Sequence, residues 1–112
     1  MNNKIILLSS NKFGAGNGEL GETVLETFFT LLKQREDLPH AIFCMNSGVL
    51  ALTDESMASL HLKELEDKGV AVFACKTCTD YYDVTDKLAA GKVSGMDHFI
   101  ELASQYEVLT IN

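Results

Sequence analysis

Short apolar runs alternate with amphipathic stretches along this 112-residue chain, and this alternation limits the folds that it can adopt. The apolar runs have the composition of strands: KIILLSS (4–10), HAIFCMN (40–46), VAVFAC (70–75) and YEVLTI (106–111). Apolar residues recur at helical spacing in longer segments: 20–32, 57–65 and 96–105. Because strand and helix alternate, we expect a three-layer α/β domain with a mostly parallel sheet of about five strands and helices on both faces.

Local signals place the remaining segments. Gly69 stands where the second helix should end. The segment 47–56 predicts a loop rich in helix-capping residues. Thr79 is expected to cap a short helix, and TDKLAAG (85–91) predicts a further turn or two of helix, closed by Gly91.

The length and composition fit one domain spanning residues 1–112. A chain of this length with 46% apolar residues buries enough surface for a single core. Linkers, repeats and low-complexity segments are absent from the sequence. We therefore expect one globular domain.

The charge balance limits the partners. A net charge of −7, with scattered cations, argues against nucleic acid, because phosphate binding needs clustered positive charge. No apolar run approaches the roughly 20 residues of a membrane span, so no membrane partner is expected. The run at 4–10 is too short for a signal peptide and better fits a buried strand. The three cysteines, an odd number, do not form a secreted disulfide framework, and we expect a cytoplasmic protein.

The first predicted strand-to-helix loop contains GNGELG (16–21), a match to the dinucleotide-binding pattern G-x-G-x-x-G. The glycines come late after the strand, and Glu19 and Glu22 would repel a pyrophosphate at the helix N-terminus. No acidic residue follows the second strand to hold a ribose. A flexible glycine loop therefore explains the pattern better than a cofactor site, and we expect no cofactor.

The third predicted strand ends in a C-x-x-C pair, Cys75 and Cys78, which fits several kinds of site. A structural metal site needs a second ligand pair, whereas Cys44 is expected inside a strand and the histidines stand singly: His40, His61 and His98. A thiol at the start of a helix, beside Lys76, suits redox chemistry. The pair follows the third strand and lacks a nearby proline, which disfavours a thioredoxin fold. A purely structural pair also stays open.

From Lys4 to Ile111 the chain resembles the DsrE/DsrF-like family, and within it the C-terminal domain of YedF-type sulfurtransferase-like selenium-metabolism proteins. The resemblance rests on these segments in order: FGAGNGELGETVLETFF, NSGVLALT, LKELEDKGVAVFACKTCTDYYDVTDKLAAGKVSGM and the closing strand. It implies a DsrE-like, flavodoxin- or Rossmann-like fold. YedF-type proteins usually carry an additional TusA-like domain, so we expect either a stand-alone domain or a fragment.

The resemblance implies that Cys75 carries sulfur, or selenium, as a persulfide and passes it to a partner thiol, with Cys78 assisting or resolving. Lys76 and Thr79 depart from the related pattern C-G-T-C-L. The loops that meet at the carboxyl edge of the sheet are expected to form the surrounding pocket: Asn11, Phe13, Gly14, Gly16, Asn46, Ser47, Gly48, Lys76, Thr77 and Tyr81. Tyr82 is expected to pack in the core or an interface.

The resemblance also implies partners. The resemblance predicts a homo-oligomer (a dimer, trimer or hexamer). It also implies a sulfur donor and an acceptor protein, one of them TusA-like. Two other hypotheses stay open: a non-catalytic oligomeric binding domain of the same fold, and a Cys75/Cys78 dithiol redox switch.

Overall fold

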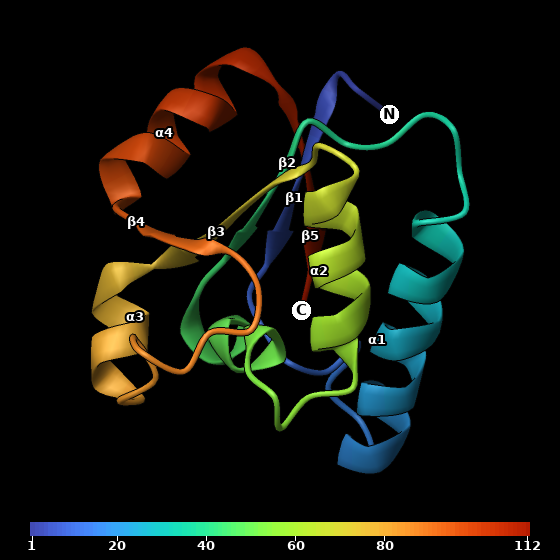
Figure 1. Cartoon of the computed structure of the whole chain (residues 1–112), viewed down its shortest axis with the longest axis vertical. Helices are drawn as coiled ribbons and strands as arrows, with labels where there is room; N and C mark the ends of the chain where they lie inside the picture. The colour runs from blue at the N-terminus through green and yellow to red at the C-terminus, as the bar shows by residue number, and fades with distance from the viewer.

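The computed structural model of the protein describes residues 1–112 and contains a five-stranded, all-parallel sheet in the order β4-β3-β2-β1-β5 (Figure 1). The strands are β1 (Lys4–Leu8), β2 (Ala41–Cys44), β3 (Ala71–Cys75), β4 (Lys92–Ser94) and β5 (Glu107–Ile111). The helices are α1 (Gly18–Leu32), the 3-10 helix η1 (Asn46–Leu52), α2 (Ala58–Asp67), α3 (Lys76–Tyr81) and α4 (Met96–Gln105). The predicted fold class is confirmed.

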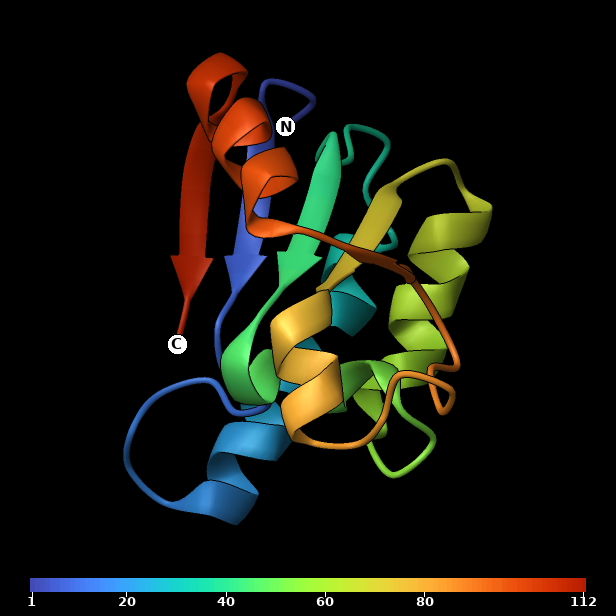
Figure 2. The same ribbon diagram turned by 90° about the vertical axis from the view of Figure 1, so that its left-hand side faces the viewer.

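Helices cover both faces of the sheet and make two cores of unequal size (Figure 2). The larger core lies under α1 and α2, where Phe29 and Leu62 pack in the same cluster as Ile42 of the sheet. The smaller core lies under α4 and includes Phe43 and Leu102. Continuous apolar strands follow from this arrangement, since each central strand must bury side chains on both faces.

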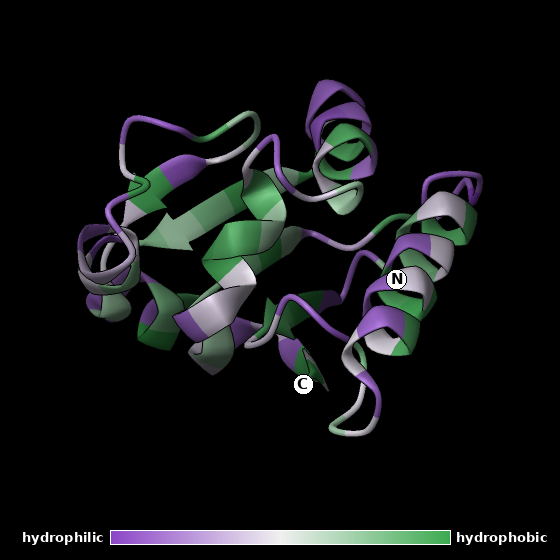
Figure 3. Cartoon of the chain, turned by 90° about the horizontal axis from the view of Figure 1, so that it is seen from below, coloured by the Kyte–Doolittle hydropathy of each residue, from purple (hydrophilic) through white to green (hydrophobic).

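Helix α1 begins at Gly18 because Asn17 caps it. The Asn17 side chain accepts a hydrogen bond from the Leu20 amide at 2.9 Å, which satisfies one of the free donors of the first turn. Hydrophobic and hydrophilic residues alternate along this helix, on the right in Figure 3, as its amphipathic pattern predicted. No helix of the protein is both long and apolar enough to cross a membrane.

One local prediction is wrong, and one strand was not predicted. The segment 85–91 is not helical; it forms turns that join the rest of the fold through an isolated antiparallel bridge between Thr53 and Leu88. The Ala89 amide also donates to the Leu52 carbonyl at 2.8 Å, so tertiary hydrogen bonds replace helical ones. The strand β4 that follows was missed, because its short, exposed, lysine-containing sequence carries no strand pattern.

The predicted loop at 47–56 also contains more structure than expected. Its first part belongs to η1, whose residues Val49, Ala51 and Leu52 are fully buried in the larger core. The apolar residues inside this run of capping residues indicated a buried turn, but the loop prediction did not take them into account.

The carboxyl ends of the strands lie at one edge of the sheet, where η1 and α3 follow β2 and β3 (Figure 2). Strand register aligns Leu8 with Cys44, Cys44 with Ala74, and Cys75 with Ser94. The loops after β1, β2 and β3 therefore share this edge, as parallel strands require.

Gly48 packs directly against the backbone carbonyl of Leu8 at this edge of the sheet. Replacing Gly48 tests how close that backbone contact is. A Cβ atom at Gly48 would lie 2.1 Å from the Leu8 carbonyl oxygen, a backbone atom that cannot move aside cheaply. We expect Gly48→Ala to lower the free energy of unfolding by about 1–3 kcal/mol, measured by urea denaturation. Gly16→Ala is the matched control, since a Cβ there meets nothing within 4 Å. Equal stability of the two variants would contradict the close approach.

Candidate functional site

The C-x-x-C pair lies at the junction of β3 and α3. Cys75 is the last residue of β3 and the N-cap of α3, with an extended backbone, and Cys78 follows within the first turn of the helix. A spacing of three residues places two side chains on the same side of a helical turn, so both thiols face the same region. All three cysteines of the chain are free thiols.

The two thiols differ in burial. Cys75 is only 4% exposed and packs in the smaller core with Phe43. Cys78 is partly exposed and contacts both cores. The presence of Cys75 raises the pKa of the Cys78 thiol, so the two thiols belong to one site with a sheltered member and an open one.

The junction between β2 and η1 supplies a hydrogen-bond donor to Cys78. The backbone N–H of Asn46 donates to the Cys78 Sγ at 3.0 Å. The Asn46 side-chain oxygen accepts a hydrogen bond from the Tyr82 hydroxyl at 3.4 Å. The loops after β2 and β3 therefore meet at Cys78, as the parallel topology predicted.

The surroundings of Cys78 act on its ionisation in opposite directions. Burial raises the pKa of the Cys78 thiol, and the Asn46 amide acts to lower the pKa. The hydrogen bond to Cys75 and the negative charge of an ionised Cys75 raise the Cys78 pKa further. The net direction is upward, so Cys78 holds its proton more firmly than an ordinary thiol.

The charged neighbour Lys76 is engaged elsewhere. Its Nζ lies 2.7 Å from an Asp80 carboxylate oxygen on the exposed side of α3. The Lys76 ammonium is the main cause that lowers the pKa of the Asp80 carboxyl, with help from a Thr85 hydrogen bond. The expectation that Lys76 activates a thiol is weakened, because Asp80 balances its charge.

A shallow pocket of about 400 Å³ opens beside Cys78 and carries no charged side chain. Its lining residues are Asn46, Thr77, Cys78, Tyr81 and Tyr82. The two tyrosine rings meet edge to face with centroids 5.3 Å apart, and Tyr81 is 83% exposed. Tyr82 follows Cys78 by four residues, a helical spacing that could have identified it as a pocket residue.

Of the predicted pocket residues, Asn46, Thr77 and Tyr81 line this pocket. Ser47 and Lys76 lie next to lining residues in the chain, and Gly48 is two residues from Asn46, but none of the three lines the pocket itself.

None of the four pocket candidates in the loop after β1 lines the pocket beside Cys78. Phe13 packs against Phe28 with ring centroids 5.9 Å apart, and the Gly14 amide donates to the Asn112 carbonyl. A Cβ at Gly16 would meet only open space.

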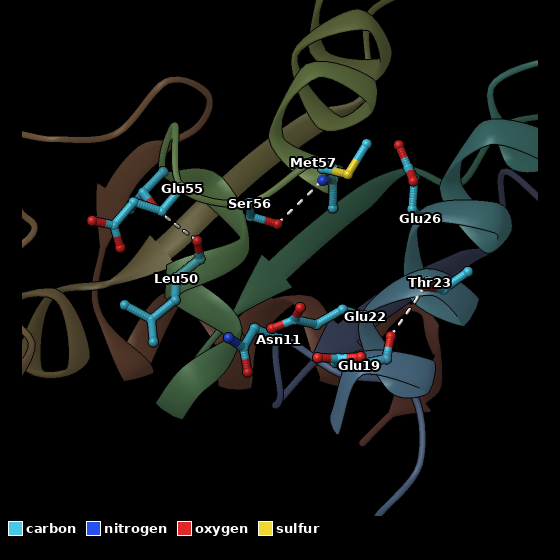
Figure 4. Close-up of a pocket in the computed structure, with 11 residues that line it drawn as sticks. Asn11, Glu19, Glu22, Thr23, Glu26, Leu50, Glu55, Ser56 and Met57 are labelled. Carbon is cyan, nitrogen blue, oxygen red and sulfur yellow. Dashed lines mark hydrogen bonds between the residues drawn. The ribbon is translucent and has the colours of Figure 1, made fainter. Parts of the chain in front are cut away.

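Asn11 lines a separate cavity of about 350 Å³ between α1 and the η1–α2 segment (Figure 4). Four carboxylates also line this cavity: Glu19, Glu22, Glu26 and Glu55. Glu19 and Glu22 belong to the first two turns of α1, where a dinucleotide phosphate would have to bind. The acidic lining supports the interpretation of G-x-G-x-x-G as a loop without a nucleotide.

The three histidines make separate contacts, and His98 bonds to Ser94, the strand partner of Cys75. His40 stacks on Tyr106 with centroids 4.2 Å apart, and His61 contacts Glu26 at 3.2 Å. His98 Nδ1 lies 2.8 Å from the Ser94 hydroxyl. No group of three or more His, Cys, Asp or Glu side chains has an arrangement that would hold a metal ion.

Three solved structures share the fold over nearly the whole chain. The ychN protein from E. coli is 22% identical, with a TM-score of 0.71, covering 97% of this chain and 99% of the other. MTH1491 from Methanobacterium thermoautotrophicum, a protein of unknown function, is 17% identical with a TM-score of 0.66, covering 96% of each chain. BT1422 from Bacteroides thetaiotaomicron, a conserved protein of unknown function, is 17% identical with a TM-score of 0.65, covering 98% and 96%.

None of the curated protein sequences matches this chain significantly. A family model, by contrast, matches almost its full length, over residues 4–111. The matched region contains every strand and helix of the sheet domain and both thiols of the pair. The chain therefore belongs to the DsrE/DsrF-like family.

Proposed function

We propose that this protein is a sulfur carrier that holds a persulfide on Cys75 and passes it to a partner thiol, with Cys78 assisting. The observation that carries the proposal is the pair of free thiols at the carboxyl edge of the sheet, with one thiol buried and the other lining an uncharged pocket. The association of the DsrE-like family with sulfur relay supports the same function.

The transfer requires only thiolates and persulfides. The Cys75 thiolate attacks the outer sulfur of a donor persulfide, R–S–SH; the new bond joins Cys75 Sγ to that sulfur, the donor S–S bond breaks, and R–S⁻ leaves. An acceptor thiolate then attacks the outer sulfur of Cys75–S–SH, which regenerates the Cys75 thiolate. Each step exchanges one S–S bond for another, so no oxidant is needed.

Cys78 assists by donating a hydrogen bond from its S–H to the Cys75 sulfur. Burial and the neighbouring Cys75 raise the pKa of the Cys78 thiol, so Cys78 offers an S–H donor to the attacking sulfur. Cys78 as a thiolate has a second role: it attacks the inner sulfur of Cys75–S–SH, releases HS⁻ and forms a Cys75–Cys78 disulfide. A dithiol reductant then supplies two electrons to restore the pair.

The burial of Cys75 suits a carrier. Oxidation of a cysteine depends on its exposure, and Cys75 is 4% exposed. A persulfide on this residue adds one sulfur atom beyond the buried Sγ, and its inner sulfur stays sheltered from thiols other than Cys78.

The partners and cargo belong to the same proposal. A separate sulfur donor and acceptor, one of them TusA-like, would meet the pocket at Cys78 and Tyr81. We propose assembly as a homo-oligomer on the family resemblance, and a place in the cytoplasm on the odd number of cysteines. The YedF-type resemblance suggests selenium as an alternative cargo, because a perselenide transfers by the same exchange.

A dithiol redox switch is the second candidate, and the spacing of two free thiols at the start of α3 favours it. In this function a mild oxidant removes two hydrogen atoms from Cys75 and Cys78 and forms their disulfide, without sulfur transfer.

Sulfur loading separates these functions. After incubation with a protein or small-molecule persulfide, we expect the intact mass of the reduced protein to rise by about 32 Da, the mass of one sulfur atom. Cys75→Ser abolishes this gain because it removes the attacking thiolate, whereas Cys78→Ser keeps it. Intact mass spectrometry without reducing agent measures both.

Cys44 provides the internal control for this experiment. Its complete burial raises the pKa of its thiol, so it stays unreactive. The double variant Cys75→Ser/Cys78→Ser, which retains only Cys44, is expected to gain no sulfur. Loading of Cys75→Ser but not of Cys78→Ser would contradict the assignment of Cys75 as carrier, and loading of neither wild type nor variant would exclude transfer.

The proton balance of the pair predicts a shift in reactivity with pH. Cys75→Ala removes the hydrogen bond and the negative charge that raise the Cys78 pKa, so we expect that pKa to fall. The pH midpoint of Cys78 alkylation by iodoacetamide, followed by peptide mass spectrometry, should move to lower pH. A midpoint that stays in place or rises would show that Cys75 does not control Cys78.

A further inference from the structure

Asn46 holds a backbone conformation that few residues adopt. Its φ is 51°, in the left-handed region, and Asp83 is the only other non-glycine residue with a positive φ. Asparagine tolerates this region better than most residues, although the conformation still costs free energy. Such conformations persist where the surrounding structure enforces them, and they cluster at functional sites.

The chain around Asn46 is held on both sides. The Met45 amide donates to the Leu8 carbonyl at 2.9 Å, and the Gly48 amide donates to the Met45 carbonyl at 2.9 Å. The Ser47 amide donates to the Asn46 side-chain oxygen at 2.8 Å. Because Gly48 also lies against the Leu8 carbonyl, this junction has little freedom to turn, and the direction of the Asn46 N–H is fixed.

The fixed N–H points at a sulfur atom. It donates to the Cys78 Sγ at 3.0 Å rather than to a backbone carbonyl. A neutral thiol is a weak acceptor, whereas a donor aimed at a developing negative charge stabilises that charge strongly. The backbone of the β2–η1 junction therefore favours negative charge on the Cys78 sulfur.

Few other charges act on this sulfur. Cys75 on β3 is the ionisable group in contact with it, and Tyr81 and Tyr82 of the α3 segment line the same pocket. η1 contains no ionisable side chain; α4 contributes Phe99 and Leu102 to the core beside Cys78, and its His98 bonds to Ser94 of β4. The Lys76–Asp80 ion pair lies on the exposed side of α3. The Asn46 amide is thus the main polar group that favours the anion.

We propose that Asn46 is a positioning residue for the thiol pair: its left-handed backbone aims its amide at Cys78 and stabilises the Cys78 thiolate. This role rests on the proposed sulfur relay, in which the Cys78 thiolate attacks the inner sulfur of Cys75–S–SH. That step forms the Cys75–Cys78 bond and expels HS⁻, and a dithiol reductant resets the disulfide. Asn46 therefore governs how readily the carrier discharges its sulfur as sulfide.

Substitutions at Asn46 that tolerate the left-handed backbone conformation to different degrees test this positioning role. Asn46→Val disfavours the left-handed conformation through its β-branched side chain and turns the amide away from Cys78. We expect alkylation of Cys78 at neutral pH to slow about tenfold, which corresponds to a rise of roughly one pKa unit. The pH midpoint of the reaction, read on the Cys78 peptide, moves upward by the same amount.

Asn46→Gly is the matched control, because glycine keeps the left-handed backbone and the amide but removes the side chain. Its Cys78 midpoint should stay near that of the wild type. Tyr82→Phe, which removes the hydroxyl contact to the Asn46 side chain, should also leave the midpoint unchanged. Asn46→Ala is measured alongside. If the valine variant does not fold, the alanine variant still allows the Cys78 midpoint to be compared with that of the glycine variant.

Equal midpoints in the alanine, glycine and wild-type proteins would overturn the role of the backbone amide. An upward shift of the same size in the glycine variant would overturn it too, because the side chain would then be responsible. These measurements need no sulfur donor. A shift in the alanine or valine variant together with no sulfur loading of the wild type would support the positioning role and reject the relay.

Discussion

The complete burial of β2 is the constraint on which the rest of this structure depends. All four of its residues are buried, between β1 and β3 in the sheet and between helical layers on both faces. A strand enclosed in this way must satisfy its backbone groups through both neighbours. Its neighbours are therefore held in register, and the carboxyl ends of three strands come to the same edge. The thiol site exists because β2 and β3 end together there.

Burial also decides how the three cysteines differ in chemistry. Cys44, inside β2, points into the larger core and is inert as a nucleophile. Cys75 ends the adjacent strand in the smaller core, and Cys78 is one helical turn further toward solvent. The same residue type thus serves as core filler, sheltered thiol and accessible thiol within a few ångströms of backbone displacement.

Most of the fold could be predicted from the sequence, because continuous apolar runs and helical stripes report burial directly. Prediction failed where local pattern and tertiary contact disagree: 85–91 has a helical composition, but hydrogen bonds to η1 and the bridge to Thr53 determine its path. For the site, the C-x-x-C pair and strand ends indicated Cys75, Cys78 and Asn46. The separation of Asn11 from the thiols, and the direction of the Asn46 amide, depend on backbone geometry that residue types do not encode.

The exposed aromatic edge of the pocket has a consequence for how the site can be observed. The chain has no tryptophan and three tyrosines, of which Tyr81 and Tyr82 line the pocket while Tyr106 stacks on His40. Aromatic rings placed edge to face respond to changes in each other's surroundings. Two of the three tyrosines of a chain without tryptophan therefore lie beside Cys78, so a change in tyrosine absorbance or emission would report on whatever occupies the thiol pocket.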